Sequence, residues 1–304
     1  MRRQIIVMFC SLLCFAHPAW AADDDAAAPS PPNRGALFKI VQDDHTLYLF
    51  GTIHVGAANF YPLEARVSAA LKSADVLALE IDPLGDPSNI ARAVQQYGMY
   101  QHGALAPHLP ADYQPRLDKL LQHYAIAPAS VAGMKPWLLA SVLTISEFAA
   151  QGYDTALAVD AFLSKQAHAR HLPVVELESA ASQMKLFDRM TAGEQLRFLE
   201  ESIDGIEDEK EARQSREIAQ AWRTADAAAL DALAKEAEDD QTFSGRFVQK
   251  VLLDERNPGL ADSIVKLLGR EHHSLAAIGV LHLIGADSVP ELLRKRGLSV
   301  ERIY

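Results

Sequence analysis

The sequence has few cysteines, and its N-terminal apolar stretch is short. Its 304 residues include only two cysteines, Cys10 and Cys14. The N-terminal apolar stretch, Ile5–Ala16, is shorter than the roughly 20 residues that a membrane-spanning helix needs. Basic residues are outnumbered, with 29 Lys and Arg against 40 Asp and Glu and a formal net charge of −11. A protein this acidic is not expected to bind nucleic acid or anionic membranes.

Several widespread catalytic signatures are missing as well. The sequence has no Gly-x-Ser-x-Gly elbow, no glycine-rich phosphate loop and no His-Glu-x-x-His pair. These absences argue against a serine hydrolase of the elbow type, a P-loop nucleotide hydrolase and a zincin protease. Any chemistry must therefore come from another arrangement of side chains.

The N-terminus has the three parts of a secretory signal peptide. Two arginines are followed by the apolar stretch and then by the small-x-small sequence Ala19-Trp20-Ala21. This order predicts a signal peptide over residues 1–21, cleaved after Ala21, and a periplasmic or secreted mature protein without a stable membrane anchor. Both cysteines lie in the removed part, so the mature chain is expected to fold without disulfides. Residues 22–35, "ADDDAAAPSPPNRG", predict a disordered tether, which leaves 36–304 as a single domain.

The order of predicted elements favours an α/β fold. Apolar and alternating runs predict strands at 37–41, 46–51, 76–81, 173–178, 274–283 and 299–304. Helices are predicted at 62–73 and 288–296, and helical insertions at about 88–171 and 180–269. Strands alternating with helices in this way predict a central, mostly parallel or mixed sheet.

A Gly-x-x-His motif occurs twice, near opposite ends of the chain. "YLFGTIHVG" contains Gly51 and His54, and "AIGVLHLIG" contains Gly279 and His282. In both copies a proline follows eight residues after the histidine, and then a predicted helix and a β run. We interpret the two ends as strand–Gly-x-x-His–helix–strand halves related by a pseudo-twofold axis, which would bring the histidines together. Imidazoles at the carboxyl edge of such a sheet could bind a divalent metal or move protons.

Acidic residues follow two of the predicted buried strands. Glu80 ends "VLALE", and Glu176 and Glu178 end "PVVELE". A carboxylate at the end of a buried strand is costly unless it is paired or bound to metal, and alternation leaves both Glu176 and Glu178 open as partners of Glu80. Arg256, in "DERN", could hold a carboxylate or polarise a carbonyl. Asp160 lies at a helix start, where a cap or salt-bridge role is the simpler interpretation.

These segments together resemble the TraB/GumN family, relatives of the Tiki proteins. The resemblance rests on "LYLFGTIHVG", "ADVLALEID", "LPVVELES", "DERNPGLADSI" and "AIGVLHLIGADSVPELLRKRGLSVERI", and it covers nearly the whole mature chain. It implies a pseudo-symmetric α/β fold with a metal-dependent hydrolase or protease site formed by His54, His282, Glu80 and Arg256. One departure is Val280-Leu281 before the second histidine, where many relatives have smaller residues.

Three functional hypotheses follow. The first is a metal-dependent hydrolase, most readily a peptidase, in which His54, His282 and Glu80 bind Zn²⁺, Mn²⁺ or Co²⁺. Glu80 would be a ligand or the general base, and Arg256 would stabilise the oxyanion. The second is a non-catalytic protein that binds a peptide or an oligosaccharide. The third is a metal-free esterase that uses histidine and glutamate as acid and base. The expected partner is a peptide or another small substrate, and a homodimer is left open.

Overall fold

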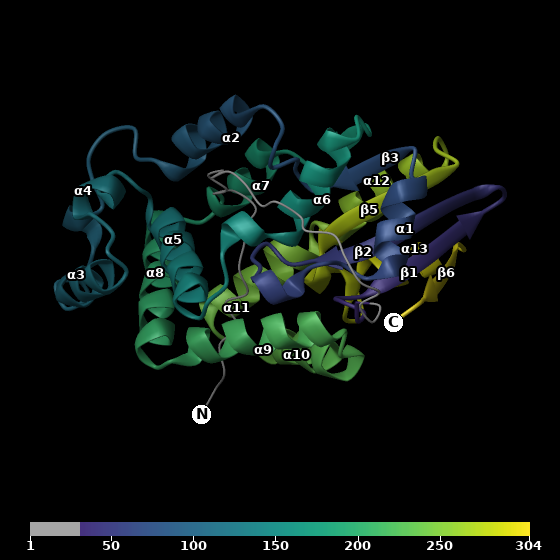
Figure 1. Ribbon diagram of the computed structural model, residues 1–304. Coiled ribbons are helices and arrows are strands. Elements are labelled where there is room, and N and C mark those ends of the chain that lie inside the picture. The colour runs from purple at the N-terminus through teal and green to yellow at the C-terminus, as the bar shows by residue number, and fades with distance from the viewer. Residues whose placement is uncertain (1–30) are drawn as a thin grey trace.

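The structure is a computed structural model that describes residues 31–304 (Figure 1). The predicted signal peptide and most of the predicted tether lie outside the described residues. Arg34 and Gly35 were assigned to the tether, but both are buried. Arg34 donates hydrogen bonds to the carbonyl oxygens of Asn59, at 3.1 Å, and Arg223. The packed part of the chain therefore begins before the predicted boundary at residue 36, because backbone carbonyls satisfy a buried guanidinium there.

A six-stranded mixed sheet forms the centre of the fold, as the sequence predicts. Its strand order is β4-β3-β5-β2-β1-β6. β2, β5, β3 and β4 are parallel neighbours, whereas β1 is antiparallel to both β2 and β6. The strands are β1 (Leu37–Gln42), β2 (His45–Thr52), β3 (Val76–Leu79), β4 (Val174–Glu176), β5 (His273–Gly279) and β6 (Ser299–Arg302).

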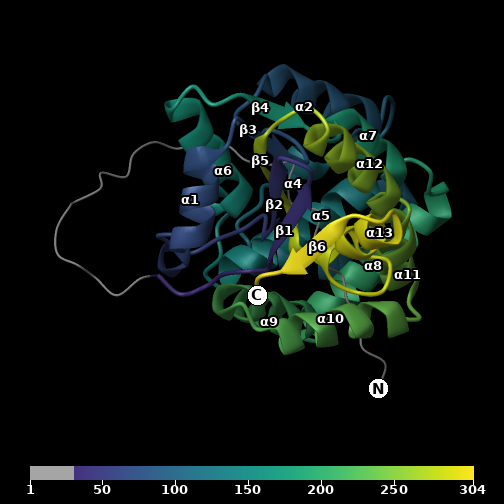
Figure 2. The ribbon, with the colours of Figure 1, turned by 90° about the vertical axis from the view of Figure 1, so that its right-hand side faces the viewer.

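The predicted repeat is visible in the topology. β2 leads through helix α1 (Ala65–Ser73) to β3, and β5 leads through helix α13 (Val289–Lys295) to β6. β2 and β5 lie side by side, and Figure 2 shows α1 and α13 on opposite sides of the sheet. β1 is inserted between β2 and β6, so the two halves are not equivalent strand for strand.

Several boundaries differ from the prediction: β3, β4 and β6 each end two residues before the predicted end, and two further differences are larger. β5 ends at Gly279, and His282 lies on a short 3-10 helix, η6 (Val280–Leu283), instead of on a strand extending to residue 283. Helix α1 begins three residues after Pro62, at Ala65. In both places the apolar run continues past the end of the regular element, because loop side chains are also packed into the core.

Some helices of the insertions, including those that carry Trp222 and Leu260, pack against the core of the sheet, and the others form a second body beside it (Figure 1). They have a buried core of their own, in which the rings of Trp137 and Phe187 stack with centroids 4.6 Å apart. Within residues 31–304, no helix combines the length and the apolar character needed to cross a membrane. The first insertion contains α2 (Pro87–Ala93), η2 (Val94–Gly98), η3 (Ala106–His108), α3 (Gln114–His123), α4 (Pro128–Val131), α5 (Pro136–Ala150), η4 (Thr155–Leu157) and α6 (Val159–Ala169). The second contains α7 (Ala180–Phe187), α8 (Ala192–Glu207), α9 (Lys210–Thr224), α10 (Ala227–Asp239), α11 (Phe243–Phe247), η5 (Val248–Asp254) and α12 (Asn257–Leu268), and η1 (Ala58–Phe60) precedes α1.

A carboxyl group with a strongly raised pKa is buried inside this helical body. Glu211, on α9, is 3% exposed and accepts a 3.0 Å hydrogen bond from Ser202. Burial, reinforced by the nearby charge of Glu147, raises the pKa of Glu211 to about 8 despite this hydrogen bond. The folded protein therefore keeps a proton that the unfolded chain releases at much lower pH.

This buried acid makes stability depend on pH. Between the ordinary glutamate pKa and pH 8 the folded state binds one proton more, so the free energy of unfolding falls as pH rises, by on the order of 1 kcal/mol per pH unit. We expect Glu211→Gln to remove most of that slope in urea unfolding curves measured between pH values of about 5 and 8. Glu301→Gln, at an exposed position on β6, is the control and should leave the slope unchanged. An equal slope in Glu211→Gln and the wild type would contradict the assignment.

Candidate functional site

The two Gly-x-x-His motifs meet at the carboxyl ends of β2 and β5. Thr52 lies opposite Gly279 in the parallel register. A Cβ atom added to Gly279 would stand 3.4 Å from His54 Nε2, 3.7 Å from His282 Cδ2 and 3.3 Å from Glu80 Oε1. Those two histidine atoms therefore lie within about 7 Å of each other. The fold brings both histidines and Glu80 to one place, around a glycine whose missing side chain leaves room for them.

The first glycine provides space in the same way. A Cβ on Gly51 would approach Val280 Cγ2 to 2.9 Å, which is closer than real Cβ contacts. Each motif glycine thus packs against the other motif: Gly51 against Val280, and Gly279 against His54. The two glycines therefore allow the motifs to pack closely against each other.

His54 is oriented by an acid from the helical insertion. Its Nδ1 lies 3.2 Å from Asp160 Oδ2, and Asp160 is buried in the first turn of α6. Its Nε2 faces Glu80 Oε1 at 3.9 Å. Burial alone would lower the pKa of His54, but Asp160 and Glu80 outweigh burial and the pKa is raised. Asp160 therefore positions His54, a contact that the simpler cap interpretation did not anticipate.

His282 is oriented by an amide that the sequence analysis did not single out. Its Nδ1 lies 2.6 Å from Asn257 Oδ1, and Asn257 Nδ2 donates to the carbonyl of Asp287 at 2.9 Å. Because the amide oxygen faces the ring, Nδ1 carries the hydrogen and Nε2 keeps its lone pair. Burial, together with the charge of Arg256, lowers the pKa of His282 to about 3, so its ring is neutral at physiological pH. The only sequence signal for Asn257 is its place directly after Arg256.

Glu80 is buried immediately after β3, with a hydrogen bond to each oxygen. Oε1 accepts from the backbone N–H of Gly279 at 2.7 Å. Oε2 accepts from Arg256 at 2.5 Å and from the Gln183 amide at 3.1 Å. Burial alone would raise the pKa of Glu80, but Arg256, the two nearby histidines and the Gly279 N–H hold it well below its usual range. The carboxylate is therefore ionised although it is buried.

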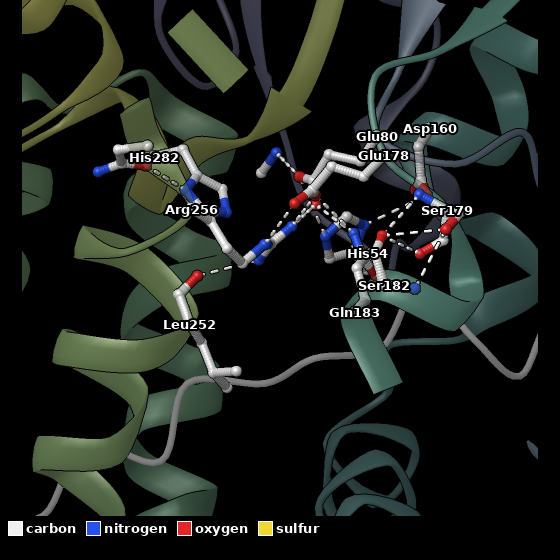
Figure 3. A network of polar contacts seen from close by, with 12 residues as sticks. His54, Glu80, Asp160, Glu178, Ser179, Ser182, Gln183, Leu252, Arg256 and His282 are labelled. Atoms are coloured by element: carbon white, nitrogen blue, oxygen red, sulfur yellow. Dashed lines mark hydrogen bonds and ion pairs between the residues drawn. The ribbon is translucent and has the colours of Figure 1, made fainter. Parts of the chain in front are cut away.

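Arg256 joins two carboxylates. It caps α12 directly after the π-helical segment η5, and its guanidinium contacts both Glu80 and Glu178 (Figure 3). Arg256 Nε donates to Glu178 at 3.0 Å, and a terminal nitrogen donates to the carbonyl of Leu252 at 3.0 Å. Burial opposes the charged form, but the two carboxylates outweigh it and raise the pKa of Arg256. Its predicted role as an oxyanion donor stays a prediction, since the contacts described here are with acids and a backbone carbonyl.

The structure distinguishes the two acids that strand alternation left equivalent. β4 ends at Glu176, whose exposed side chain accepts from the backbone N–H of Asp82 at 3.0 Å. Glu178, two residues further on, turns toward Arg256 instead. Gln183 of α7 donates to Glu80 and, at 2.9 Å, to Glu178. No sequence signal identifies Gln183, because its position depends on how α7 packs over the sheet edge.

A small pocket of about 50 Å³ opens over these groups. Its polar part is formed by His54, Glu80, Arg256 and His282. The opposite wall is apolar and comes from the helical insertions and η6: Phe148, Ile218, Val248, Leu252, Leu253 and Leu281. Concave, mainly apolar sites with a few convergent polar groups are typical of small-molecule and peptide binding.

The two site histidines could hold a metal ion, although the ligand atoms of His54, His282 and Glu80 do not all lie within 4.8 Å of one another. Each Nδ1 is taken by Asp160 or Asn257, which leaves Nε2 as the donor, as in known histidine metal sites. The 3.9 Å between His54 Nε2 and Glu80 Oε1 is within the span of two bonds of about 2 Å to one ion. Within residues 31–304, the histidines and acids whose ligand atoms all lie within 4.8 Å of one another are a different set: Asp44, His45 and His272.

Sequence comparison places this arrangement in a known family. The model of the TraB/PrgY/gumN family matches residues 36–302, which is most of the chain. The chain belongs to the TraB/PrgY/gumN family. It is similar to the uncharacterized protein YbaP of Escherichia coli (strain K12), with 25% identity over 250 residues, covering 81% of this chain and 87% of YbaP. YbaP of Shigella flexneri matches to the same extent, and no solved structure matches significantly. Membership confirms the predicted resemblance and assigns no activity.

The buried ion cluster gives the site a measurable signature in stability. We expect Arg256→Ala to lower the free energy of unfolding by about 3–5 kcal/mol, because Glu80 and Glu178 would be left buried without their cation. Adding Glu80→Gln and Glu178→Gln to that variant should restore part of the loss, since it removes the uncompensated charges. The matched control is Arg189→Ala, which breaks an exposed pair with Glu255 and should cost less than about 1 kcal/mol. Urea unfolding measures all four proteins, and equal losses in the two single arginine variants would contradict the cluster.

Proposed function

We propose that this TraB/PrgY/gumN family member is an exported metal-dependent hydrolase, most readily a peptidase. The divalent ion would be held by Nε2 of His54, Nε2 of His282 and Oε1 of Glu80. The observation that carries this proposal is the shared orientation of the two histidines. Each has Nδ1 fixed by a buried polar side chain, both rings line the pocket with Glu80, and His54 Nε2 lies 3.9 Å from Glu80 Oε1.

Two imidazoles and one carboxylate suit Zn²⁺, Mn²⁺ or Co²⁺ and leave positions for water and substrate. When bound, such an ion polarises a carbonyl and makes a water molecule more acidic near neutral pH. The residues of the protein would position the ligands around the ion. Asp160 and Asn257 hold the rings in place, and the neutral state of His282 makes its lone pair available as a donor.

The hydrogen bonds of Glu80 support one of the two roles that the sequence left open, namely that of a ligand. Oε2 is occupied by Arg256 and Gln183, so only Oε1 is directed toward Gly279 and His54. We therefore assign Glu80 as a one-oxygen ligand and Arg256 as the group that positions it. Glu178 completes the arrangement by sharing the guanidinium charge.

The pocket wall supports a substrate with an apolar group beside the reacting bond. Ile218, Val248 and Leu252 would contact a side chain placed over the two histidines. The net charge of −11 makes anionic polymers poor substrates. An apolar residue within a peptide fits both features.

Metal binding is the first test. We expect His54→Ala and His282→Ala each to weaken binding of Zn²⁺, Mn²⁺ or Co²⁺ at this site at least about 100-fold, because each removes one of three ligands. Equilibrium dialysis of metal-free mature protein, followed by elemental analysis, measures the loss. His102→Ala, at an exposed position in the helical insertion, is the control and should bind normally. Unchanged binding in both site variants would end the metal hypothesis.

The orienting residues extend this test. Asp160→Asn and Asn257→Ala leave the three ligands in place but remove the partner of each Nδ1. We expect a loss of about 10–100-fold in metal affinity, as for other outer-shell partners.

Cleavage of peptides that contain one apolar residue tests for turnover. Cleavage that is lost on chelation and restored by the ion supports a metal-dependent peptidase. Binding without cleavage supports the non-catalytic alternative, and hydrolysis that survives chelation supports the esterase.

A further inference from the structure

A second group of potential metal ligands lies at the opposite end of the same two strands. His45 is the first residue of β2, Asp44 precedes it, and His272 directly precedes β5. His54 and His282 follow the other ends of β2 and β5. Since β2 has eight residues and a strand rises about 3.3 Å per residue, the two groups are separated by more than about 20 Å. Whatever binds here is distinct from the pocket.

The distances within this group match those around one ion. His45 Nε2 lies 3.4 Å from Asp44 Oδ1, and His272 Nδ1 lies 3.3 Å from Asp44 Oδ2. Ligand atoms bound tetrahedrally at about 2.0–2.1 Å stand roughly 3.3 Å apart. The two imidazole rings are tilted by 42° relative to each other, with centroids 4.6 Å apart. A carboxylate and two imidazoles thus converge without rearrangement of the backbone.

His45 is already oriented as a ligand by a contact outside the group. Its Nδ1 lies 2.6 Å from the backbone carbonyl oxygen of Leu268, which can only accept a hydrogen bond. Nδ1 must therefore carry the hydrogen, and a neutral ring presents its lone pair on Nε2, the atom that faces Asp44. This is the arrangement in which a metal-binding histidine donates its other N–H to a carbonyl. The backbone N–H of Thr46 also donates to the carbonyl of His272 at 2.8 Å, which fixes the two histidines side by side.

We propose that Asp44, His45 and His272 form a second divalent-metal site, with Zn²⁺ as its ion. Two imidazole nitrogens and one carboxylate oxygen are ligands that zinc accepts, with water in the remaining position. The side chains of Asp44 and His272 are 73% and 62% exposed, so the ion enters from solvent, whereas the His45 side chain is 20% exposed and anchors the site. His273 and Asp75 form a separate pair: the backbone N–H of His273 donates to Asp75 Oδ2 at 2.9 Å, whereas His273 Nδ1 lies 3.9 Å from that oxygen.

The site is placed to fasten two distant parts of the chain. Asp44 belongs to the turn between β1 and β2, His45 begins β2, and His272 belongs to the connection from α12 to β5. An ion shared by them links segments that are more than 200 residues apart in sequence. Since the unfolded chain does not bring these ligands together, binding stabilises the folded state by mass action. The function assigned to this site is therefore structural.

The test uses metal-free mature protein with Zn²⁺ alone. We expect His272→Ala to lower zinc affinity at this site at least about 100-fold and to abolish the rise in the thermal unfolding midpoint that zinc causes, roughly 5 °C at saturation. His45→Ala should behave alike, and the exposed His272 provides a variant whose fold is not in question. The matched control is His273→Ala, the adjacent exposed histidine, which should keep both the affinity and the thermal shift. An unchanged zinc count and thermal shift in His272→Ala, or equal losses in His272→Ala and His273→Ala, would overturn the proposal.

The same experiment separates this site from the pocket. If both sites bind zinc, the wild type holds two ions, His282→Ala holds one and keeps the thermal shift, and His272→Ala holds the other. A single ion that is lost in His272→Ala and retained in His282→Ala would support the structural site and contradict the proposed function. A single ion that is retained in His272→Ala and lost in His282→Ala would support the proposed function and contradict the structural site.

Discussion

The parallel pairing of β2 with β5 is the constraint on which the rest of the site depends. Its register sets Thr52 opposite Gly279, so the two Gly-x-x-His loops leave the sheet at the same height. A slip of one residue would move every side chain of a strand to the other face and would separate the loops. The glycines make the close approach possible, because a Cβ on either would meet the opposite motif. The backbone hydrogen bonds between β2 and β5 therefore bring the two imidazoles together, and the contacts of their side chains set the orientation of each ring.

Charge burial is the second constraint. Glu80 and Arg256 are both almost fully buried, and each is costly in that environment without its partner. Glu178 and Gln183 saturate the remaining hydrogen-bonding positions from α7 and the segment before it. These helical residues therefore do more than cover the sheet: they make an ionised carboxylate tolerable at the end of β3. The apolar wall of the pocket comes from the same insertions, so the helical body supplies both the electrostatics and the shape of the site.

The sequence predicted the sheet, the repeated strand–helix units and the convergence around His54, Glu80 and His282, because these depend on apolar runs and on the geometry of parallel strands. It did not separate Glu178 from Glu176, since β4 ends between them and alternation no longer applies. Nor did it find Gln183 or Asn257, or the contact between Asp160 and His54. Those residues reach the site through helix packing, which periodicity along the chain does not encode. The sequence pattern was therefore sufficient to predict the residues contributed by the sheet, but not those contributed by helices that pack over the strand ends.

The strand order has a consequence for how the protein comes into being. β5, contributed by residues 273–279, is inserted between β2 and β3, which are formed much earlier in the sequence. An incomplete chain that ends before residue 273 has a gap in the middle of its sheet and only one of the two motif histidines. Long-range pairing of this kind delays folding until the last segments are available. A chain that ends before residue 273 therefore lacks both the central strand β5 and the pocket residues Gly279 and His282.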